Sequence, residues 1–186
     1  MVEQGSFQFP DGGSSPTSTL QVKQLRIDRC DISHAVSLVK QWHSRLPECT
    51  NIAMIAFRAH YLNVTYAVAI WSNCSARLLP QEWMELRRMA CGPESPKNTA
   101  SRMLSIMTKL IPQYFPTCPK VISYQDTEVH TGTIYKAAGW TIGEIYEGTS
   151  RDRSQIEGEG KHFGYRTGMN GKRPDGAAKI RWEKLL

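Results

Sequence analysis

The stretch from Met84 to Trp140 limits the possible folds more than any other part of this 186-residue chain. It contains two short apolar segments of the kind that form strands, and each is followed by a polar loop and a helix-like segment. Strands that alternate with helices in this way predict an α/β domain. Loops that open helices also present free N–H groups, which suit phosphate binding, so we expect the active site in this stretch.

The pattern of apolar residues along the whole chain predicts one mixed sheet with the element order β-α-β-β-β-α-β-α-β. The expected strands span residues 20–27, 52–58, 64–71, 83–90, 119–124 and 140–146, and the expected helices span 31–42, 98–112 and 131–138. We expect Asp31 to cap the first helix, Pro112 to stop the second and Gly139 to end the third. Alternating polarity at 177–186 predicts a final strand.

The expected strand at 83–90 contains two consecutive arginines, which alternation assigns to opposite faces. Arg88 is expected on the face of Met84 and Leu86, and Arg87 on the face of Glu85 and Met89. One of the two must therefore face the covered side of the sheet or a cleft. A carboxylate or a phosphate is the expected partner of an arginine in such a place.

Positive charge is concentrated towards the C-terminus. The chain has a formal net charge of +6, and seven Lys or Arg stand against two acids after residue 160. This balance favours an anionic partner such as nucleic acid or a phosphate-rich cofactor. Residues 1–19, rich in Gly, Ser, Pro and Thr, are interpreted as a flexible lead-in. Residues 20–186 are interpreted as a single domain that includes a basic C-terminal tail at 147–186.

The sequence gives no sign of a membrane segment or of a zinc ribbon. No apolar run approaches the roughly 18 residues that a membrane span needs, and no signal peptide is recognisable. Five cysteines at wide spacing, without a Cys-x-x-Cys pair, are interpreted as thiols in a reducing cytoplasm. No His, Asp or Glu pair has the helical spacing of a metal site, so no metal ligands are assigned.

The order of elements and the segment GTIYKAAGW at 132–140 resemble the GNAT acyltransferase fold. The resemblance implies that Tyr135 lies near the sulfur of coenzyme A and protonates the leaving thiolate, a role that suits a hydroxyl of pKa near 10. Tyr135 as a core residue is the alternative. The family's glycine-rich phosphate loop is missing before the long helix, where the sequence reads SPKNTASR at 95–102. The helix N-terminus there, with Lys97 and Arg102, could still hold a phosphate.

A closer resemblance is to the Mom family of phage DNA-modification proteins, a divergent branch of the GNAT fold. Six pieces at sensible spacing carry it: HSRLP at 43–47, ELRR at 85–88, NTASR at 98–102, SYQD at 123–126, GTIYKA at 132–137 and GTS at 148–150. The resemblance implies an enzyme that converts adenine in DNA to a carbamoylmethyl adenine at its exocyclic amine. Such modification protects phage DNA from restriction, and the enzyme is expected to act in the host cytoplasm.

The resemblance also implies a set of site residues. The expected catalytic residues are His43, Arg87, Ser101, Asp126 and Tyr135. Asp126 would orient or deprotonate the adenine amine, Ser101 would donate a hydrogen bond to the group donor, and His43 would be a base or a metal ligand. The residues expected to bind the cofactor are Asn98, Thr99, Arg102, Ser123 and Tyr124. The donor is acetyl-CoA or another group donor, and a metal ion such as iron stays an open alternative.

Each of these residues also has a structural interpretation. Asp126 could cap the next helix, and Ser101 could bond its own backbone. Arg87 could form an ion pair with Glu85 or Asp126, and His43 could be a surface residue at the end of a helix.

The expected partner is DNA, either double-stranded or locally unpaired. The amine of a paired adenine is not accessible, so base flipping or action on single strands is expected. The basic tail, which contains His162, Phe163, Tyr165 and Trp182, could supply both the cations that bind the phosphates and an aromatic residue that stacks on the base. Two other hypotheses are an acyl-CoA N-acyltransferase for a small amine or protein, and a nucleic-acid-binding module without catalysis.

Overall fold

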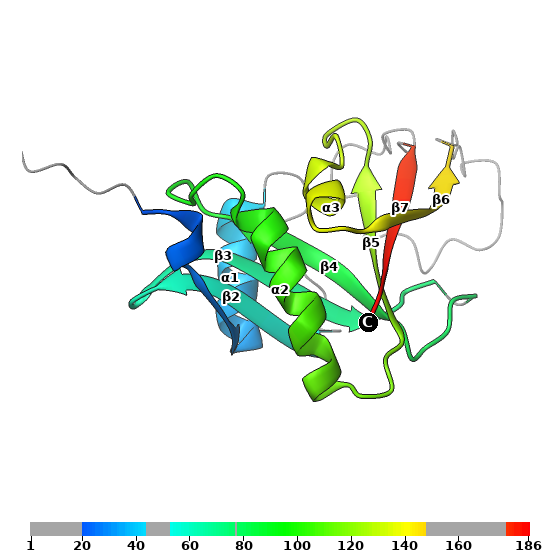
Figure 1. The fold of residues 1–186 in the computed structure, drawn as a ribbon, viewed down its shortest axis with the longest axis horizontal. Coiled ribbons are helices and arrows are strands. Elements are labelled where there is room, and N and C mark those ends of the chain that lie inside the picture. The colour runs from blue at the N-terminus through cyan, green and yellow to red at the C-terminus, as the bar shows by residue number, and fades with distance from the viewer. Residues whose placement is uncertain (1–19, 44–52, 77, 148–177) are drawn as a thin grey trace, which may run out of the picture.

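The computed structural model describes residues 20–43, 53–76, 78–147 and 178–186. In these residues a seven-stranded mixed sheet has the order β1-β2-β3-β4-β5-β7-β6 (Figure 1). The strands are β1 (Arg26–Cys30), β2 (Ile55–Tyr61), β3 (Val64–Asn73), β4 (Met84–Cys91), β5 (Lys120–Asp126), β6 (Thr141–Tyr146) and β7 (Lys179–Leu185). The helices are α1 (Ile32–Trp42), α2 (Thr99–Tyr114) and α3 (Thr133–Ala137), with the 3-10 turn η1 (Val22–Gln24) before β1. This architecture confirms the predicted α/β class.

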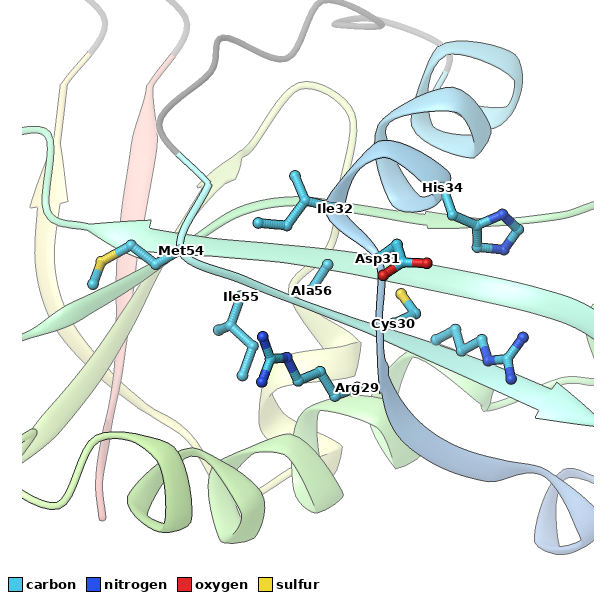
Figure 2. A pocket seen from close by; sticks show the side chains of 9 residues that line it. Arg29, Cys30, Asp31, Ile32, His34, Met54, Ile55 and Ala56 are labelled. Atoms are coloured by element: carbon cyan, nitrogen blue, oxygen red, sulfur yellow. The ribbon is translucent and has the colours of Figure 1, made fainter.

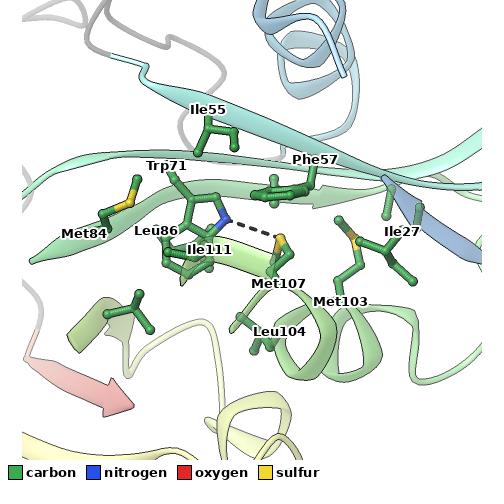
Figure 3. Close-up of a cluster of buried hydrophobic side chains, with 14 of the residues drawn as sticks. Ile27, Ile55, Phe57, Trp71, Met84, Leu86, Met103, Leu104, Met107 and Ile111 are labelled. Atoms are coloured by element: carbon green, nitrogen blue, oxygen red, sulfur yellow. Dashed lines mark hydrogen bonds between the residues drawn. The ribbon is translucent and has the colours of Figure 1, made fainter. Parts of the chain in front are cut away.

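Helices cover both faces of the sheet (Figure 1). One face of β2, β3 and β4 packs against α1, and the opposite face carries α2, with α3 beside it. The apolar positions of α2 recur at helical spacing, and Met103, Met107 and Ile111 are fully buried against the strands. At the centre of this core, the indole N–H of Trp71 lies 3.3 Å from the Sδ of Met107 (Figure 3).

The face assigned to Arg88 is wrong, because the strand contains a bulge, whereas Arg87 stays on the face of Glu85 as predicted. Ile70 of β3 pairs with Arg88 and Trp71 pairs with Leu86, so Arg87 is the extra residue. The bulge resets the alternation, and Met89 therefore packs into the same core as Leu86. The alternation of polar and apolar residues cannot reveal a bulge, because the extra residue differs from its neighbours in strand pairing and not in residue type.

Two predicted boundaries also differ from the structure. Pro112 does not stop the second helix, which continues to Tyr114, because Met107 and Ile111 pack this end of the helix against the sheet. The first strand begins at Arg26 rather than at residue 20, since η1 occupies Val22–Gln24. Gly139 has a φ of 69° and ends α3, as predicted.

The last residues of the chain form an inner strand of the sheet. β7 pairs with β5 on one side and with β6 on the other, both antiparallel. Trp182, expected to stack on a base, is only 3% exposed and belongs to the core. The rest of the predicted basic tail, with His162, Phe163 and Tyr165, lies outside the described residues, as does the predicted lead-in at 1–19. None of the described helices is long and apolar enough to span a membrane.

Candidate functional site

The sheet opens where β4 and β5 separate. These two strands are parallel and pair only from Met84 with Val121 to Leu86 with Ser123. Beyond Leu86, the bulge at Arg87 turns β4 away, and the rest of the strand pairs with β3 alone. The two strands therefore diverge towards their C-terminal ends, next to α2 and α3. Ligands of α/β proteins commonly bind at such an opening beyond the carboxyl ends of parallel strands.

A cavity of about 280 Å³ lies at the N-terminus of α2. It is lined by the loop between β4 and α2, by Ala100 and Ser101 in the first turn of α2, and by residues of α3. The first helical hydrogen bond is donated by Arg102 N–H to the carbonyl of Asn98. No described side chain caps the helix, and the N–H groups of Ala100 and Ser101 have no described partner. Such an uncapped N-terminus attracts anions, phosphate above all.

Asn98 supplies the backbone conformation that a glycine would otherwise provide in this loop. Its φ is 70°, in the left-handed region, and it immediately precedes α2. Asparagine enters this region more easily than most residues with a side chain. The glycine-poor loop can therefore make the tight turn into the helix. Gly92 serves packing instead, because a Cβ there would lie 3.0 Å from the ring of Trp42.

The predicted residues on α2 have unequal access to this cavity. Ser101 lines it, although its hydroxyl donates to the carbonyl of Asn98 at 3.1 Å, as its structural interpretation requires. Thr99 also lines it, and its Oγ1 donates to the carbonyl of Pro96 at 2.6 Å. Arg102 is not among the lining residues. Its Nη2 lies 3.3 and 3.4 Å from the carbonyls of Lys23 and Leu25, so this arginine fastens α2 to the chain before β1.

Tyr135 and Ser123 meet on the same side of the sheet. The Tyr135 Oη lies 2.8 Å from the Ser123 Oγ. The Tyr135 ring stacks on Trp182, with centroids 5.3 Å apart and an interplanar angle of 11°, and meets the edge of Trp140. Burial raises the pKa of Tyr135 above its usual value, and the bond to Ser123 offsets this only in part. The phenol is therefore protonated at neutral pH and can only donate its proton.

The remaining predicted residues lie on the other face of the sheet. Arg87 Nη1 donates to Glu85 Oε1 at 2.9 Å, which is the structural ion pair considered for it. Glu85 is itself buried and accepts two further bonds from Ser75. Asp126 ends β5, and its Oδ1 accepts the N–H of Glu128 at 3.1 Å in a local turn. Tyr124 points to the same face as Asp126, because the two residues are separated by one position in β5.

His43 follows α1 at its C-terminal end, where its N–H donates to the carbonyl of Val39. Burial lowers the pKa of the His43 imidazole, and the nearby Arg88 and His130 lower it further. The His43 imidazole is therefore neutral at neutral pH. The rest of the HSRLP piece, at 44–47, lies outside the described residues, and so does GTS at 148–150.

Sequence reasoning missed Arg88 and His130 as neighbours of His43. Arg88 was assigned to the wrong face because of the bulge, and His130 belongs to no recognised piece. The sequence indicated a role for His130 only through its position in the loop that follows Asp126. In the described part of the chain, no group of three or more His, Cys, Asp or Glu side chains could hold a metal ion.

A second hollow, of about 700 Å³, lies between β1, the start of α1 and β2 (Figure 2). Its walls combine Arg29 and Arg58 with the carboxylate of Asp31, so their charge selects no single kind of ligand. Burial raises the pKa of the Cys30 thiol in this hollow to about 11, which leaves the thiol unreactive. None of the predicted site residues lines it.

Solved structures similar to this chain are acetyltransferases. The coenzyme A complex of an acetyltransferase from Bacillus subtilis matches with a TM-score of 0.57 and 13% identity, over 87% of this chain and 99% of the other. The ribosomal-protein-S18-alanine N-acetyltransferase from Escherichia coli matches with a TM-score of 0.56 and 10% identity, over 87% and 94%. The IAA acetyltransferase from Bacillus cereus matches with a TM-score of 0.54 and 14% identity, over 87% and 99%. At this identity the likeness shows the fold alone.

The sequence itself places the chain in a family. No curated protein sequence matches it. The model of the Mom protein family, however, matches residues 24–183, which include every described strand except the last two residues of β7. The predicted resemblance is thus confirmed for both the family and the fold. The chain belongs to the Mom protein family and has the fold of GNAT acetyltransferases.

Proposed function

We propose that the chain modifies adenine in DNA at its exocyclic amine, giving a carbamoylmethyl adenine that protects phage DNA from restriction. Membership of the Mom family is the observation that carries this proposal. The fold supports a group transfer, since the similar structures are acetyltransferases.

In this proposal the donor binds on the α2 side of the sheet and the adenine amine on the α1 side. On the α2 side, the uncapped helix N-terminus borders the cavity, and Tyr135 holds a proton beside Ser123. On the α1 side, Asp126 and His43 lie at the ends of β5 and α1. An amine that forms a bond to carbon must release a proton, which Asp126 or the neutral His43 can accept. Tyr135, which is 7% exposed and belongs to the core, would return a proton to a leaving group on the other side.

A phosphate-bearing donor such as an acyl-CoA fits the residues around the cavity. The unpartnered N–H groups of Ala100 and Ser101 would hold a phosphate, as helix N-termini do. The donor itself would supply the activated group. Arg102 is committed to the carbonyls before β1 and would contribute through its charge alone.

The direct test is to produce the protein in a bacterium that carries a plasmid, digest the plasmid DNA to nucleosides and measure the mass of deoxyadenosine. We expect a heavier deoxyadenosine from the wild-type protein and none from Asp126→Ala. Glu82→Gln, which removes a carboxylate at an exposed position, should leave the heavy product unchanged. The reaction is repeated with plasmid DNA and the soluble, folded wild-type protein in a cell extract, to which a lysate of phage-infected cells is added as a source of the donor. An unmodified deoxyadenosine pool in that extract would refute the proposal.

A second candidate is a conventional acyl-CoA N-acyltransferase for a small amine or a protein, favoured by the cavity at α2. Ala100→Glu would place a carboxylate in the first turn of α2, where it repels phosphate but stabilises the helix. Acetyl-CoA binding by calorimetry should therefore weaken in Ala100→Glu without loss of thermal stability. Tight acetyl-CoA binding with acetylated amines and unmodified DNA would favour this candidate. DNA binding without either product would favour a module without catalysis.

A further inference from the structure

We propose that Tyr124 and Tyr146 form the aromatic wall against which a single flipped-out adenine stacks. This proposal rests on the proposed function and deepens it, since it assigns the acceptor base to one face of the sheet. The two tyrosines come from β5 and β6, which are separated by β7. Their ring centroids lie 6.0 Å apart at an interplanar angle of 50°, and both side chains are partly exposed.

The strand register places this wall beside Asp126. Lys179 of β7 pairs with Asp126 on one side and with Tyr146 on the other, so these three residues form one row across the sheet. Tyr124 precedes Asp126 by two residues and therefore shares its face. A base that stacks on the tyrosines would present its edge to the carboxylate of Asp126.

A network of charged groups holds the wall in place. Tyr146 Oη donates to Glu144 Oε2 at 2.6 Å and accepts from Arg181 Nη1 at 2.8 Å. Arg181 also bonds Glu144 at 2.7 Å and, through its Nε, Glu183 at 2.9 Å. The ring of Tyr146 is thus fixed before any ligand arrives. An aromatic group that is already immobile loses little conformational entropy on binding, which favours a stacking role.

The side chains on this face favour a nucleotide over other substrates that could accept the transferred group. Every base has a π-face that can stack on an aromatic side chain. The carboxylate of Asp126 can accept a hydrogen bond from the exocyclic amine of adenine. Arg88 at the β4 bulge and the exposed Lys179 supply positive charge for the phosphates on either side of the base. The cavity at α2 opens on the opposite side, so base and donor would approach the strand opening from opposite faces.

A fluorescent base tests the wall without requiring activity. The probe is a single-stranded oligonucleotide that carries one 2-aminopurine in place of adenine, whose fluorescence is quenched by stacking on an aromatic ring. We expect quenching by the wild-type protein and by Tyr146→Phe, which keeps the ring. Tyr146→Leu should abolish quenching and weaken oligonucleotide binding about 5- to 100-fold. Tyr114→Leu, at an exposed tyrosine near the end of α2, should behave as the wild type.

Thermal unfolding of each variant separates stacking from a structural role. A wall that only fastened β6 to β7 would be damaged equally by Tyr146→Phe and Tyr146→Leu, since both lose the hydroxyl bonds. If Tyr146→Leu does not fold, Tyr124→Leu is expected to show the same loss of quenching. Absence of quenching by the wild-type protein, or equal quenching by folded Tyr146→Leu or Tyr124→Leu, would overturn the proposal. Unmodified DNA together with ring-dependent quenching would contradict the proposed function and leave the wall supported.

Discussion

At the scale of single residues, backbone conformation decides the role of Asn98. A φ of 70° lets the chain turn into α2 in a loop that lacks the glycines of the usual GNAT phosphate loop. The same turn leaves the first N–H groups of α2 open to the cavity. The position should therefore accept only residues that tolerate the left-handed region.

We expect Asn98→Gly to keep the wild-type stability, because glycine adopts positive φ without steric cost. Asn98→Val should cost about 1–2 kcal/mol or more, since its Cβ and branched side chain collide with the backbone in this region. Urea unfolding measures both values. Equal stability of the two variants would show that the turn does not require positive φ.

His43 gives the second prediction at this scale, through the pH dependence of stability. Its pKa is lower in the folded protein than the ordinary value of 6.5, because of burial and then of Arg88 and His130. The unfolded chain therefore takes up the proton first as the pH falls below 6.5, and stability is lost until the folded pKa is passed. Well above pH 6.5 the imidazole is neutral in both states and contributes no slope. Urea midpoints at pH 7.5 and 5.5 should differ less in His43→Gln than in the wild type, and an unchanged difference would contradict this.

At the scale of elements, α2 shows how a helix tolerates a residue that should end it. Pro112 lies inside the last turn and cannot donate the hydrogen bond that a residue there normally makes. Tertiary packing compensates, because Met107 and Ile111 bury the helix against the sheet.

Pro112→Ala should therefore stabilise the protein, by up to about 3 kcal/mol if the proline strains the turn fully. Lys109→Ala, at an exposed position of the same helix, should change stability by less than about 0.5 kcal/mol. Thermal unfolding compares the two. A loss of stability in Pro112→Ala would mean that the proline ring contributes more by packing than it costs in hydrogen bonding.

β4 is the second element on which the site depends. Its bulge at Arg87 limits the parallel pairing with β5 to three residue pairs, so the strands part where the predicted residues gather. The bulge also leaves Arg87 paired with Glu85 and brings Arg88 near His43. One extra residue in a strand thus shapes both sides of the opening.

At the scale of the whole molecule, the chain end completes the site. β7 joins β5 to β6, and Trp182 in it stacks on Tyr135 and donates to Gln125 Oε1 at 2.7 Å. Gln125 in turn donates to the carbonyl of His130. The C-terminal strand therefore supports the predicted proton donor and the loop that carries His130.

Trp182→Ala should cost about 3–5 kcal/mol of stability, as expected for a large aromatic side chain removed from a core. Leu185→Ala, in the same strand but 72% exposed, should cost less than about 0.5 kcal/mol. Chemical denaturation gives both values. Similar costs for the two changes would show that β7 contributes backbone pairing alone.

The sequence by itself determined the types and the order of the strands and helices, because periods of two and of 3.6 residues are local properties of the chain. It also determined the family, since the six short pieces keep their order and spacing. The pairing of Ser123 with Tyr135 on one face, and the place of Tyr124 and Asp126 on the other, agree with simple alternation in β5.

Only the tertiary structure decided which of these residues meet. The bulge in β4, the attachment of Arg102 to Lys23 and Leu25, and the burial of Trp182 all depend on partners far away in the chain. The same holds for His130 near His43, and for Tyr146 against Tyr124. Such contacts form when strands that are distant in sequence pair in one sheet, and a local pattern carries no record of the partner strand.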